Sequence, residues 1–225
     1  MNNTITIGLP SKGRLKDKTI SFFEENGSKI LQSDKERNYF ATIENKPNVK
    51  IIFLHAKEII QRLGDGTIDI GISGLDLLNE SEKNLRDKIV LKKKLNFGNA
   101  NLVVAVPDDW IDVQTIADLE EVSFDIRLRR NSRLRVATKY PNLTNEFLIS
   151  KGVTQYKLIP SLGATETYPF IGSSEVITDI TSTGKTLTDN NLRVLKDGQI
   201  LNSAACLFVA KKKAAKLQPF LNSLG

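Results

Sequence analysis

Strand-like and helix-like hydrophobic patterns alternate along almost the whole chain. Ile5, Ile7 and Leu9 alternate with polar or small residues, as in a strand, and apolar residues at helical spacing follow over residues 15–23. Because strands separated by helices need crossover connections, the pattern predicts the α/β class with a largely parallel sheet. Further strands are predicted at 51–54, 68–72, 102–106, 134–137, 156–159, 176–180 and 201–210, and further helices at 56–63, 75–78, 113–119 and 143–150.

Length and composition agree with a globular protein that has a substantial core. The chain has 225 residues, of which 40% are apolar and 26% charged, and this length allows one large domain or two smaller ones. Met1 to Thr4 carry no positively charged start before an apolar run, and no apolar stretch approaches the ~20 residues that span a bilayer. We therefore expect a cytoplasmic protein without a membrane partner.

One cysteine and one histidine leave few options for the chemistry. A zinc site of the usual Cys/His kind cannot be assembled from them. Cys206 lies in an apolar stretch, where a thiol is typically a small core side chain. His55 follows a buried-looking run and has no G-x-S-x-G partner, which disfavours serine-type nucleophilic catalysis, so we interpret His55 as structural.

Basic residues exceed acidic ones, with 32 lysines and arginines against 26 aspartates and glutamates and a formal net charge of +6. Such a balance can serve nucleic acid, an anionic membrane or a small polyanionic substrate. The charge-dense stretch from Asp125 to Arg135 has no interleaved aromatic residues that could stack on bases, so we interpret it as a solvated connection before a strand. Lys211 to Lys213 begin a predicted amphipathic helix whose small apolar face disfavours membrane binding. We therefore expect no nucleic-acid partner.

The clearest chemical signal lies within residues 176–187. A β-branched strand brings Asp179 to its carboxyl end, and a turn rich in hydroxyl side chains then opens a predicted helix. Unpaired N–H groups at a helix N-terminus attract phosphate, and Ser182, Thr183 and Thr186 add hydroxyl donors. Because Asp179 can accept hydrogen bonds from vicinal sugar hydroxyls, the segment suits a sugar with a 5′-phosphate. An ordinary strand-to-helix turn with a Ser/Thr cap is an equal alternative.

A glycine stands beside a cation in two stretches, one within residues 176–187 and one after the first predicted strand. Gly184-Lys185-Thr186 spells the second half of a P-loop, but the first glycine of G-x-x-x-x-G-K-T would fall at position 179, which is aspartate, so the P-loop interpretation fails. Lys12 and Arg14 follow the first strand, and the carboxyl edge of an open α/β sheet is where ligands bind. This turn is weak evidence by itself, and Arg37 has no distinguishing context of its own.

Five segments in register resemble those of one known family. They occur in the order and approximate spacing of the ATP phosphoribosyltransferases, the first enzymes of histidine biosynthesis, and they span essentially the whole chain. The chain resembles the short form of that family, because it stops soon after residues 201–210, where the long form continues into a regulatory domain. The five segments are Leu9 to Leu15, Asp69 to Leu78, Arg135 to Asn142, Gly163 to Glu166 and Asp179 to Leu187.

The resemblance implies a fold, a reaction and partners. The family's fold is similar to that of the two-lobed, type II periplasmic binding proteins, with the active site in the cleft between the lobes. Residues 1–98 with 202–225 would form lobe I, and residues 99–201 would form lobe II. The implied reaction joins ATP and 5-phosphoribosyl-1-pyrophosphate (PRPP), with Mg²⁺, into N1-(5-phosphoribosyl)-ATP and pyrophosphate. Short-form catalytic chains would pair as homodimers and join a histidyl-tRNA-synthetase-like regulatory subunit in a hetero-octamer.

The same resemblance implies roles for individual residues. Adenine N1 is already nucleophilic and needs no strong base, so the enzyme must supply positioning and cations for the departing pyrophosphate. Arg14 and Arg37, assisted by Lys12, would stabilise the pyrophosphate, and Asp179 would hold the ribose hydroxyls, directly or through Mg²⁺. The 5′-phosphate would be held in lobe II by Ser182, Thr183, Gly184, Thr186 and Leu187. The ATP side and the cleft would be lined by Thr138, Lys139, Tyr140, Glu166, Asp69, Gly71 and Gly74.

Several alternatives stay open on the sequence. The three first-lobe positions in that last group have a structural explanation at least as good as a functional one. His55 stands where many members of the family carry arginine, and residues 108–133 carry no motif, so we give neither a role. A non-catalytic solute-binding or effector-sensing domain is the rival function, since the same architecture serves both. A type I phosphoribosyltransferase is a poorer match, because that family places two adjacent acids before its threonine loop and Thr178 precedes Asp179 here.

Overall fold

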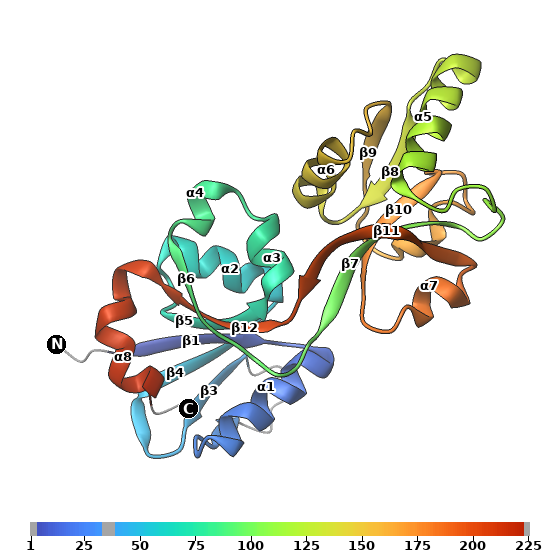
Figure 1. Cartoon of the computed structure of the whole chain (residues 1–225). Helices are drawn as coiled ribbons and strands as arrows, with labels where there is room; N and C mark the ends of the chain where they lie inside the picture. The colour runs from blue at the N-terminus through green and yellow to red at the C-terminus, as the bar shows by residue number, and fades with distance from the viewer. Residues whose placement is uncertain (1–3, 33–38, 223–225) are drawn as a thin grey trace. The chain divides into compact units, whose positions relative to one another are not determined.

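The computed structural model describes residues 4–32 and 39–222, which fold into two compact units (Figure 1). Unit 1 comprises Met1–Gly98 and Ala204–Gly225, and unit 2 comprises Asn99–Ser203. The chain therefore leaves unit 1 once and returns to it once. Arg37, to which the family resemblance assigns a role at the leaving pyrophosphate, lies outside the described residues.

Unit 1 is built on a mixed sheet. Its described strands are β1 (Ile5–Pro10), β2 (Ile30–Gln32), β3 (Phe40–Ile43), β4 (Lys46–Leu54), β5 (Ile70–Gly74), β6 (Ile89–Lys94) and β12 (Ala205–Ala210). They pair in the order β2-β3-β4-β1-β5-β12-β6. The centre is parallel, since β1 pairs in parallel with both β4 and β5, whereas the remaining neighbours are antiparallel.

Helices cover both faces of this sheet (Figure 1). They are α1 (Gly13–Glu25), α2 (Ala56–Asp65), α3 (Leu75–Glu80), α4 (Lys83–Arg86) and α8 (Ala214–Asn222). Phe23 of α1 and Leu217 of α8 join the core on one face, together with Ile70 and Ile72 of β5. The core on the other face lies beneath α2 to α4 and includes Phe208 of β12. The alternation of side chains along β12 thus supplies both cores, with Leu207 and Val209 in one and Phe208 in the other.

Unit 2 is built on a smaller mixed sheet. Its described strands are β7 (Ala100–Pro107), β8 (Leu134–Thr138), β9 (Tyr156–Pro160), β10 (Val176–Thr181) and β11 (Leu192–Ser203). They pair in the order β11-β7-β10-β8-β9. β8 is parallel to both β10 and β9, while β7 is antiparallel to both of its neighbours. Three parallel strands therefore end at the same edge.

Two long helices and two short ones flank the sheet of unit 2. They are α5 (Ile116–Arg130) and α6 (Pro141–Ser150), and the short η1 (Thr165–Thr167) and α7 (Lys185–Asp189). Helices α5 and α6 pack on one face and α7 on the other. A capping box starts α5, since the Thr115 hydroxyl accepts the Asp118 N–H and the Asp118 carboxylate accepts the Thr115 N–H. No helix within the described ranges has the length and apolar character that a membrane crossing needs.

The α/β class is confirmed, but three expectations about the elements are wrong. The sheets are mixed rather than largely parallel, because β7 and β12 run antiparallel to their neighbours. The apolar stretch 201–210 is not one strand: β11 ends and β12 begins around Ala204, and the two belong to different sheets. The charged stretch is not a loop, since α5 continues to Arg130 and Arg135 lies on β8, where its guanidinium binds the Glu175 carboxylate.

Candidate active site

The carboxyl ends of three parallel strands in unit 2 bring most of the predicted site residues together. Because β8, β9 and β10 run parallel, the residues that follow or end them meet at one edge of the sheet. Lys139 follows β8, residues 161–166 follow β9, and Asp179 lies near the end of β10. The Ser161 N–H donates to the Thr138 carbonyl oxygen at 2.9 Å, which holds the first two segments side by side.

The Asp179 carboxyl group at this edge has a raised pKa. Burial raises its pKa above the ordinary carboxyl value, since only 14% of the side chain is exposed, and the Glu166 charge raises it further. Lys139, whose Nζ lies 4.0 Å from Oδ2, and the Ile180 N–H, which donates to Oδ1 at 2.8 Å, lower that pKa without cancelling the effect of burial. The Thr165 hydroxyl acts in the same direction. A largely buried carboxylate whose neighbours do not offset its desolvation gains from a ligand that brings hydroxyl groups or a divalent cation.

The neighbours of Lys139 in sequence have interior side chains. Thr138 is 2% exposed and Tyr140 6% exposed, and the Thr138 hydroxyl accepts the Tyr140 N–H at 2.9 Å. Lys139 is therefore the one residue of these three that offers an exposed side chain, while Glu166 is partly exposed. The structure brings Lys139, Glu166 and Asp179 together and leaves Thr138 and Tyr140 to shape the backbone.

The turn after β10 is shaped by a glycine and by an internal hydrogen bond. Gly184 has φ +75°, a conformation that strains any residue with a Cβ, and its N–H donates to Thr181 Oγ1 at 2.9 Å. The side chains of Ser182, Thr183 and Thr186 are exposed. Leu187 differs from its neighbours in the turn, because its side chain is buried in the core of unit 2. It can offer a ligand only its backbone N–H, which has no helical acceptor in the first turn of α7.

Unit 1 has an equivalent edge where the parallel strands β1, β4 and β5 end. Lys12 is the N-cap of α1 and Arg14 lies in its first turn, and both are exposed. The Ser11 N–H donates to the Leu54 carbonyl oxygen at 2.9 Å, which fixes this turn against the end of β4. Among the described residues, no acid forms an ion pair with Lys12 or Arg14. These two cations are therefore free of described acids and available to an anionic ligand.

His55 also lies at this edge, as the N-cap of α2. Its Nδ1 accepts the Lys57 N–H at 3.4 Å, so one ring nitrogen serves the helix start. This hydrogen bond supports a structural role for His55.

The structure does not bring Asp69 and Gly71 to the edge where Gly74 lies. Asp69 precedes β5 at the opposite end of the strand, where its buried carboxylate accepts the Thr6 N–H at 2.7 Å and pairs with Lys213. Gly71 lies inside β5, and a Cβ there would come 2.5 Å from Ile59 Cγ2. Both residues therefore serve packing and folding. Gly74 ends β5 and caps α3, where a Cβ would lie 2.2 Å from the Asp76 carboxylate.

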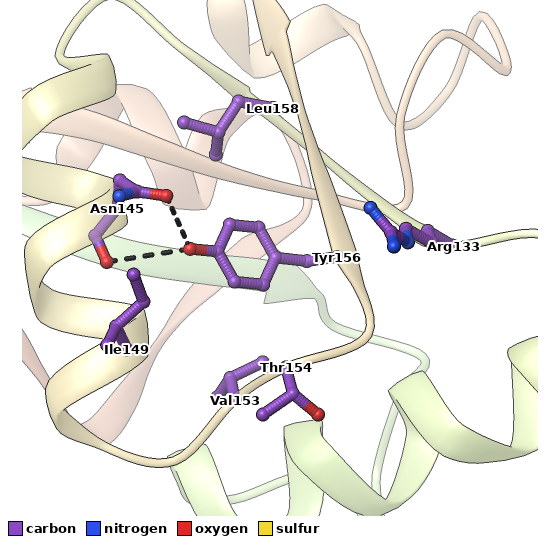
Figure 2. Close-up of a pocket in the computed structure, with 7 residues that line it drawn as sticks. All are labelled: Arg133, Asn145, Ile149, Val153, Thr154, Tyr156 and Leu158. Carbon is purple, nitrogen blue, oxygen red and sulfur yellow. Dashed lines mark hydrogen bonds between the residues drawn. The ribbon is translucent and has the colours of Figure 1, made fainter.

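A pocket of about 420 Å³ lies away from both edges, between α6 and β9 (Figure 2). The Tyr156 hydroxyl donates to Asn145 Oδ1 at 2.6 Å in its wall, and burial raises the Tyr156 pKa. None of the predicted site residues lines this pocket, so we do not assign it to the predicted site. Its lining consists of Arg133, Asn145, Ile149, Val153, Thr154, Tyr156 and Leu158.

A pocket of about 440 Å³ reaches the edge of unit 1 and contains residues that the sequence analysis missed. Its walls include Ser11 and His55 from the edge and the rings of Tyr39 and Phe40, which are 58% and 60% exposed. Arg62 also lines this pocket, where its guanidinium pairs with the Glu58 carboxylate. The position of the two aromatic rings next to Arg37 in the sequence was the one available signal.

The residues present fit a magnesium ion that arrives with a phosphorylated substrate. Mg²⁺ is usually held by one or two carboxylates together with substrate phosphates, and Asp179 with the nearby Glu166 offers such carboxylates. Among the described residues, no group of three or more His, Cys, Asp or Glu side chains could hold a metal ion without a substrate.

Comparisons with known proteins identify the family to which the chain is similar. A family model described as ATP phosphoribosyltransferase matches residues 55–224. An ATP phosphoribosyltransferase of Brucella melitensis is 47% identical over 210 residues, which cover 93% of this chain and 91% of that protein. Another from Chelativorans sp. is 48% identical over 211 residues, which cover 93% and 92%.

Solved structures give the same picture for the fold. A chain of the ATP phosphoribosyl transferase (HisG:HisZ) complex from Thermotoga maritima is 26% identical, with a TM-score of 0.74 over 98% of this chain and 96% of that one. An extracellular-binding protein of an amino-acid ABC transporter from Bacillus subtilis is 14% identical, with a TM-score of 0.57 over 99% and 91%. The second likeness shows a shared fold only.

Proposed function

The chain belongs to the ATP phosphoribosyltransferase family, and from this premise we propose how its residues divide the work of the reaction. The fold is of the α/β, type II periplasmic-binding-protein-like kind. The activity is that of a glycosyltransferase for pentosyl groups: ATP and PRPP give N1-(5-phosphoribosyl)-ATP and pyrophosphate, the first step of histidine biosynthesis.

We propose that the edge of unit 2 binds the ribose 5-phosphate part of PRPP. The observation that carries this proposal is the largely buried Asp179 carboxylate, with its raised pKa, beside an exposed turn of hydroxyl groups. Asp179 accepts hydrogen bonds from the ribose hydroxyls. Ser182, Thr183 and Thr186 hold the 5′-phosphate with their hydroxyl groups, in a turn that Gly184 shapes. The N–H groups of Gly184 and Lys185 donate to Thr181 and Thr183 within the turn, so the Leu187 N–H is the backbone donor we assign to the phosphate.

We propose that the cations at the edge of unit 1 act on the pyrophosphate. The adenine N1 lone pair forms a bond to the anomeric carbon of the ribose, and the bond from that carbon to the pyrophosphate oxygen breaks with its electron pair on the oxygen. Arg14, with Lys12 and with Arg37 from outside the described residues, stabilises the negative charge that grows there. A single well-placed donor contributes about 3–4 kcal/mol to such a step.

Mg²⁺ and the remaining residues of the site have supporting roles in this proposal. Asp179, together with the PRPP phosphates, would hold Mg²⁺, whose charge would offset that of the substrate. Lys139 lies 4.0 Å from Asp179 and keeps a cation beside the carboxylate, while Glu166 orients a hydroxyl or the adenine amino group by accepting a hydrogen bond. Gly74 has no Cβ, which leaves room for the Asp76 carboxylate at the end of β5.

We propose that the chain works with a regulatory partner in the cytoplasm. The relative from Thermotoga maritima was solved as a HisG:HisZ complex, which supports a HisZ-like, histidyl-tRNA-synthetase-like subunit for this chain also. The stoichiometry we propose is a homodimer of catalytic chains within a hetero-octamer. Native mass spectrometry of the chain co-expressed with a HisZ-like subunit of the source cell tests this, and a catalytic chain that stays unbound would contradict it.

The central experiment supplies the purified chain with ATP, PRPP and Mg²⁺. We expect pyrophosphate release matched mole for mole by phosphoribosyl-ATP, and a faster rate with the regulatory partner. Absence of both products, with and without the partner, would overturn the assignment. Asp179→Asn is the site-specific arm, and we expect it to raise the KM for PRPP more than the KM for ATP.

A further inference from the structure

Three buried threonine hydroxyls form a closed ring of hydrogen bonds under the edge that carries Lys139 and Asp179. Thr138 Oγ1 lies 3.1 Å from Thr144 Oγ1, Thr144 Oγ1 lies 2.7 Å from Thr178 Oγ1, and the Thr178 hydroxyl donates to Thr138 Oγ1 at 2.6 Å. The three residues come from β8, α6 and β10, and none is more than 2% exposed. The ring therefore joins three elements without contact with solvent.

The hydrogen bonds of the ring can run in only one direction. Each threonine hydroxyl has a single proton to donate. Since Thr178 donates to Thr138, the ring closes only when Thr138 donates to Thr144 and Thr144 donates to Thr178. The Tyr140 N–H adds a second donor to Thr138 Oγ1 at 2.9 Å, which completes the hydrogen bonds of that oxygen. Loss of the Thr144 hydroxyl would leave one buried donor and one buried acceptor without a partner.

The ring lies one residue before each of the two charged groups. Thr138 and Thr178 are the last residues in register between β8 and β10, so the ring cross-links these strands where their regular pairing ends. Successive side chains of a strand point to opposite faces, so Thr178 points toward α6 and Asp179 to the other face. On β8, the Thr138 hydroxyl also holds the Tyr140 N–H and thus the turn that contains Lys139.

We infer that Thr144 is a positioning residue for PRPP binding. Its hydroxyl does not reach the substrate, since the residue is fully buried, but it fixes the Lys139 turn against β10 and so sets the position of Lys139 relative to Asp179. A closed set of buried hydrogen bonds is stronger than isolated pairs, and it rigidifies the groups attached to it. The inference rests on the proposed role of Asp179 in binding PRPP.

Steady-state kinetics of Thr144→Val, which removes the hydroxyl and keeps the shape, tests the inference. We expect the KM for PRPP to rise about tenfold, because a small misplacement of the binding groups is costly, while the KM for ATP changes less than about twofold. Thr144→Ser retains the hydroxyl and should restore the KM for PRPP to near the wild-type value.

The matched control is Ser123→Ala, which also removes a buried hydroxyl from unit 2. Ser123 is fully buried on α5 and donates to the Glu120 carbonyl oxygen at 2.8 Å, away from the edge. We expect it to lower the melting temperature and to leave the KM for PRPP unchanged. If Thr144→Val fails to fold, Thr178→Val with Thr178→Ser breaks and restores the same ring from β10.

Two results would overturn the inference. One is a wild-type KM for PRPP in Thr144→Val; the other is a raised KM that Ser123→Ala shares or that Thr144→Ser does not reverse. Asp179→Asn separates this failure from failure of the proposed function. If Asp179→Asn raises the KM for PRPP and Thr144→Val does not, the inference alone is wrong. If Asp179→Asn leaves that KM unchanged, the proposed function of the edge is wrong, and the positioning role falls with it.

Discussion

Replacing Gly71 by alanine should destabilise unit 1 without weakening substrate binding. A Cβ at this position would lie 2.5 Å from Ile59 Cγ2 and 3.0 Å from Leu63 Cδ1, inside the ~3.5–4 Å of an ordinary carbon contact. Ile59 is buried and branched at Cβ, so its methyl cannot turn away freely, and α2 must shift from the sheet. Overpacking of this kind costs about 1–3 kcal/mol. Alanine also lowers the conformational entropy of the unfolded chain, which offsets about 0.5–1 kcal/mol of that cost.

At the midpoints of these two ranges the net loss is about 1 kcal/mol, which corresponds to a melting temperature lower by about 2–4 °C for a chain of this length. Circular dichroism melts measure this loss, and initial rates give the KM for both substrates. Gly163→Ala, where a Cβ meets nothing within 4 Å, should leave the melt unchanged. In an Ile59→Ala background, which removes Cγ2, Gly71→Ala should cost less than it does alone. A wild-type melting temperature combined with a raised KM would refute the packing role of Gly71.

Three further predictions concern charged groups. Asp179→Asn should raise the KM for PRPP at least about tenfold and also raise the melting temperature at neutral pH. The raised pKa means that the folded chain binds this proton more tightly than the unfolded chain, so the ionised carboxylate costs stability above that pKa, and the cost fades as the pH falls through it. Equal melts of wild type and variant at pH 7.5 would contradict this reasoning. Arg14→Ala should lower kcat by about 100- to 1,000-fold and change the KM for PRPP less, and an effect on KM alone would argue against its role at the leaving group. Lys213→Met should lower the melting temperature, because it leaves the buried Asp69 carboxylate with the Thr6 N–H but without its cation. An unchanged melt would mean that this N–H suffices.

The elements that the sequence predicted well are those whose signal is local. Strict alternation marks β1, and helical spacing marks α2, before any contact is known. Within residues 201–210 the polar residues Asn202 and Ser203 precede the break, but nothing local says that the segments before and after it join different sheets. β12 pairs with β5 and β6 of one unit and β11 with β7 of the other, and both pairings join segments far apart in the chain.

The candidate site shows the same division between local and distant information. Asp179 and its hydroxyl-rich turn form one continuous segment, so the sequence could point to them. Gly71 and Gly74 share a motif, and only the contacts of α2 and of Asp76 distinguish a packing glycine from one at the edge. Thr144 carries no signal at all in the sequence, because its partners lie on β8 and β10 and meet it only after folding.

The place of β12 in its sheet has a consequence for biosynthesis. β12 lies between β5 and β6, yet it is translated after the whole of unit 2, which is one continuous stretch of chain. Until β12 leaves the ribosome, β5 and β6 each lack a neighbour, and their open edges can pair with other chains. Multidomain proteins generally fold from the amino terminus during translation. Here the order is reversed, since unit 2 can complete its sheet first and the unit that begins the chain is the last to close.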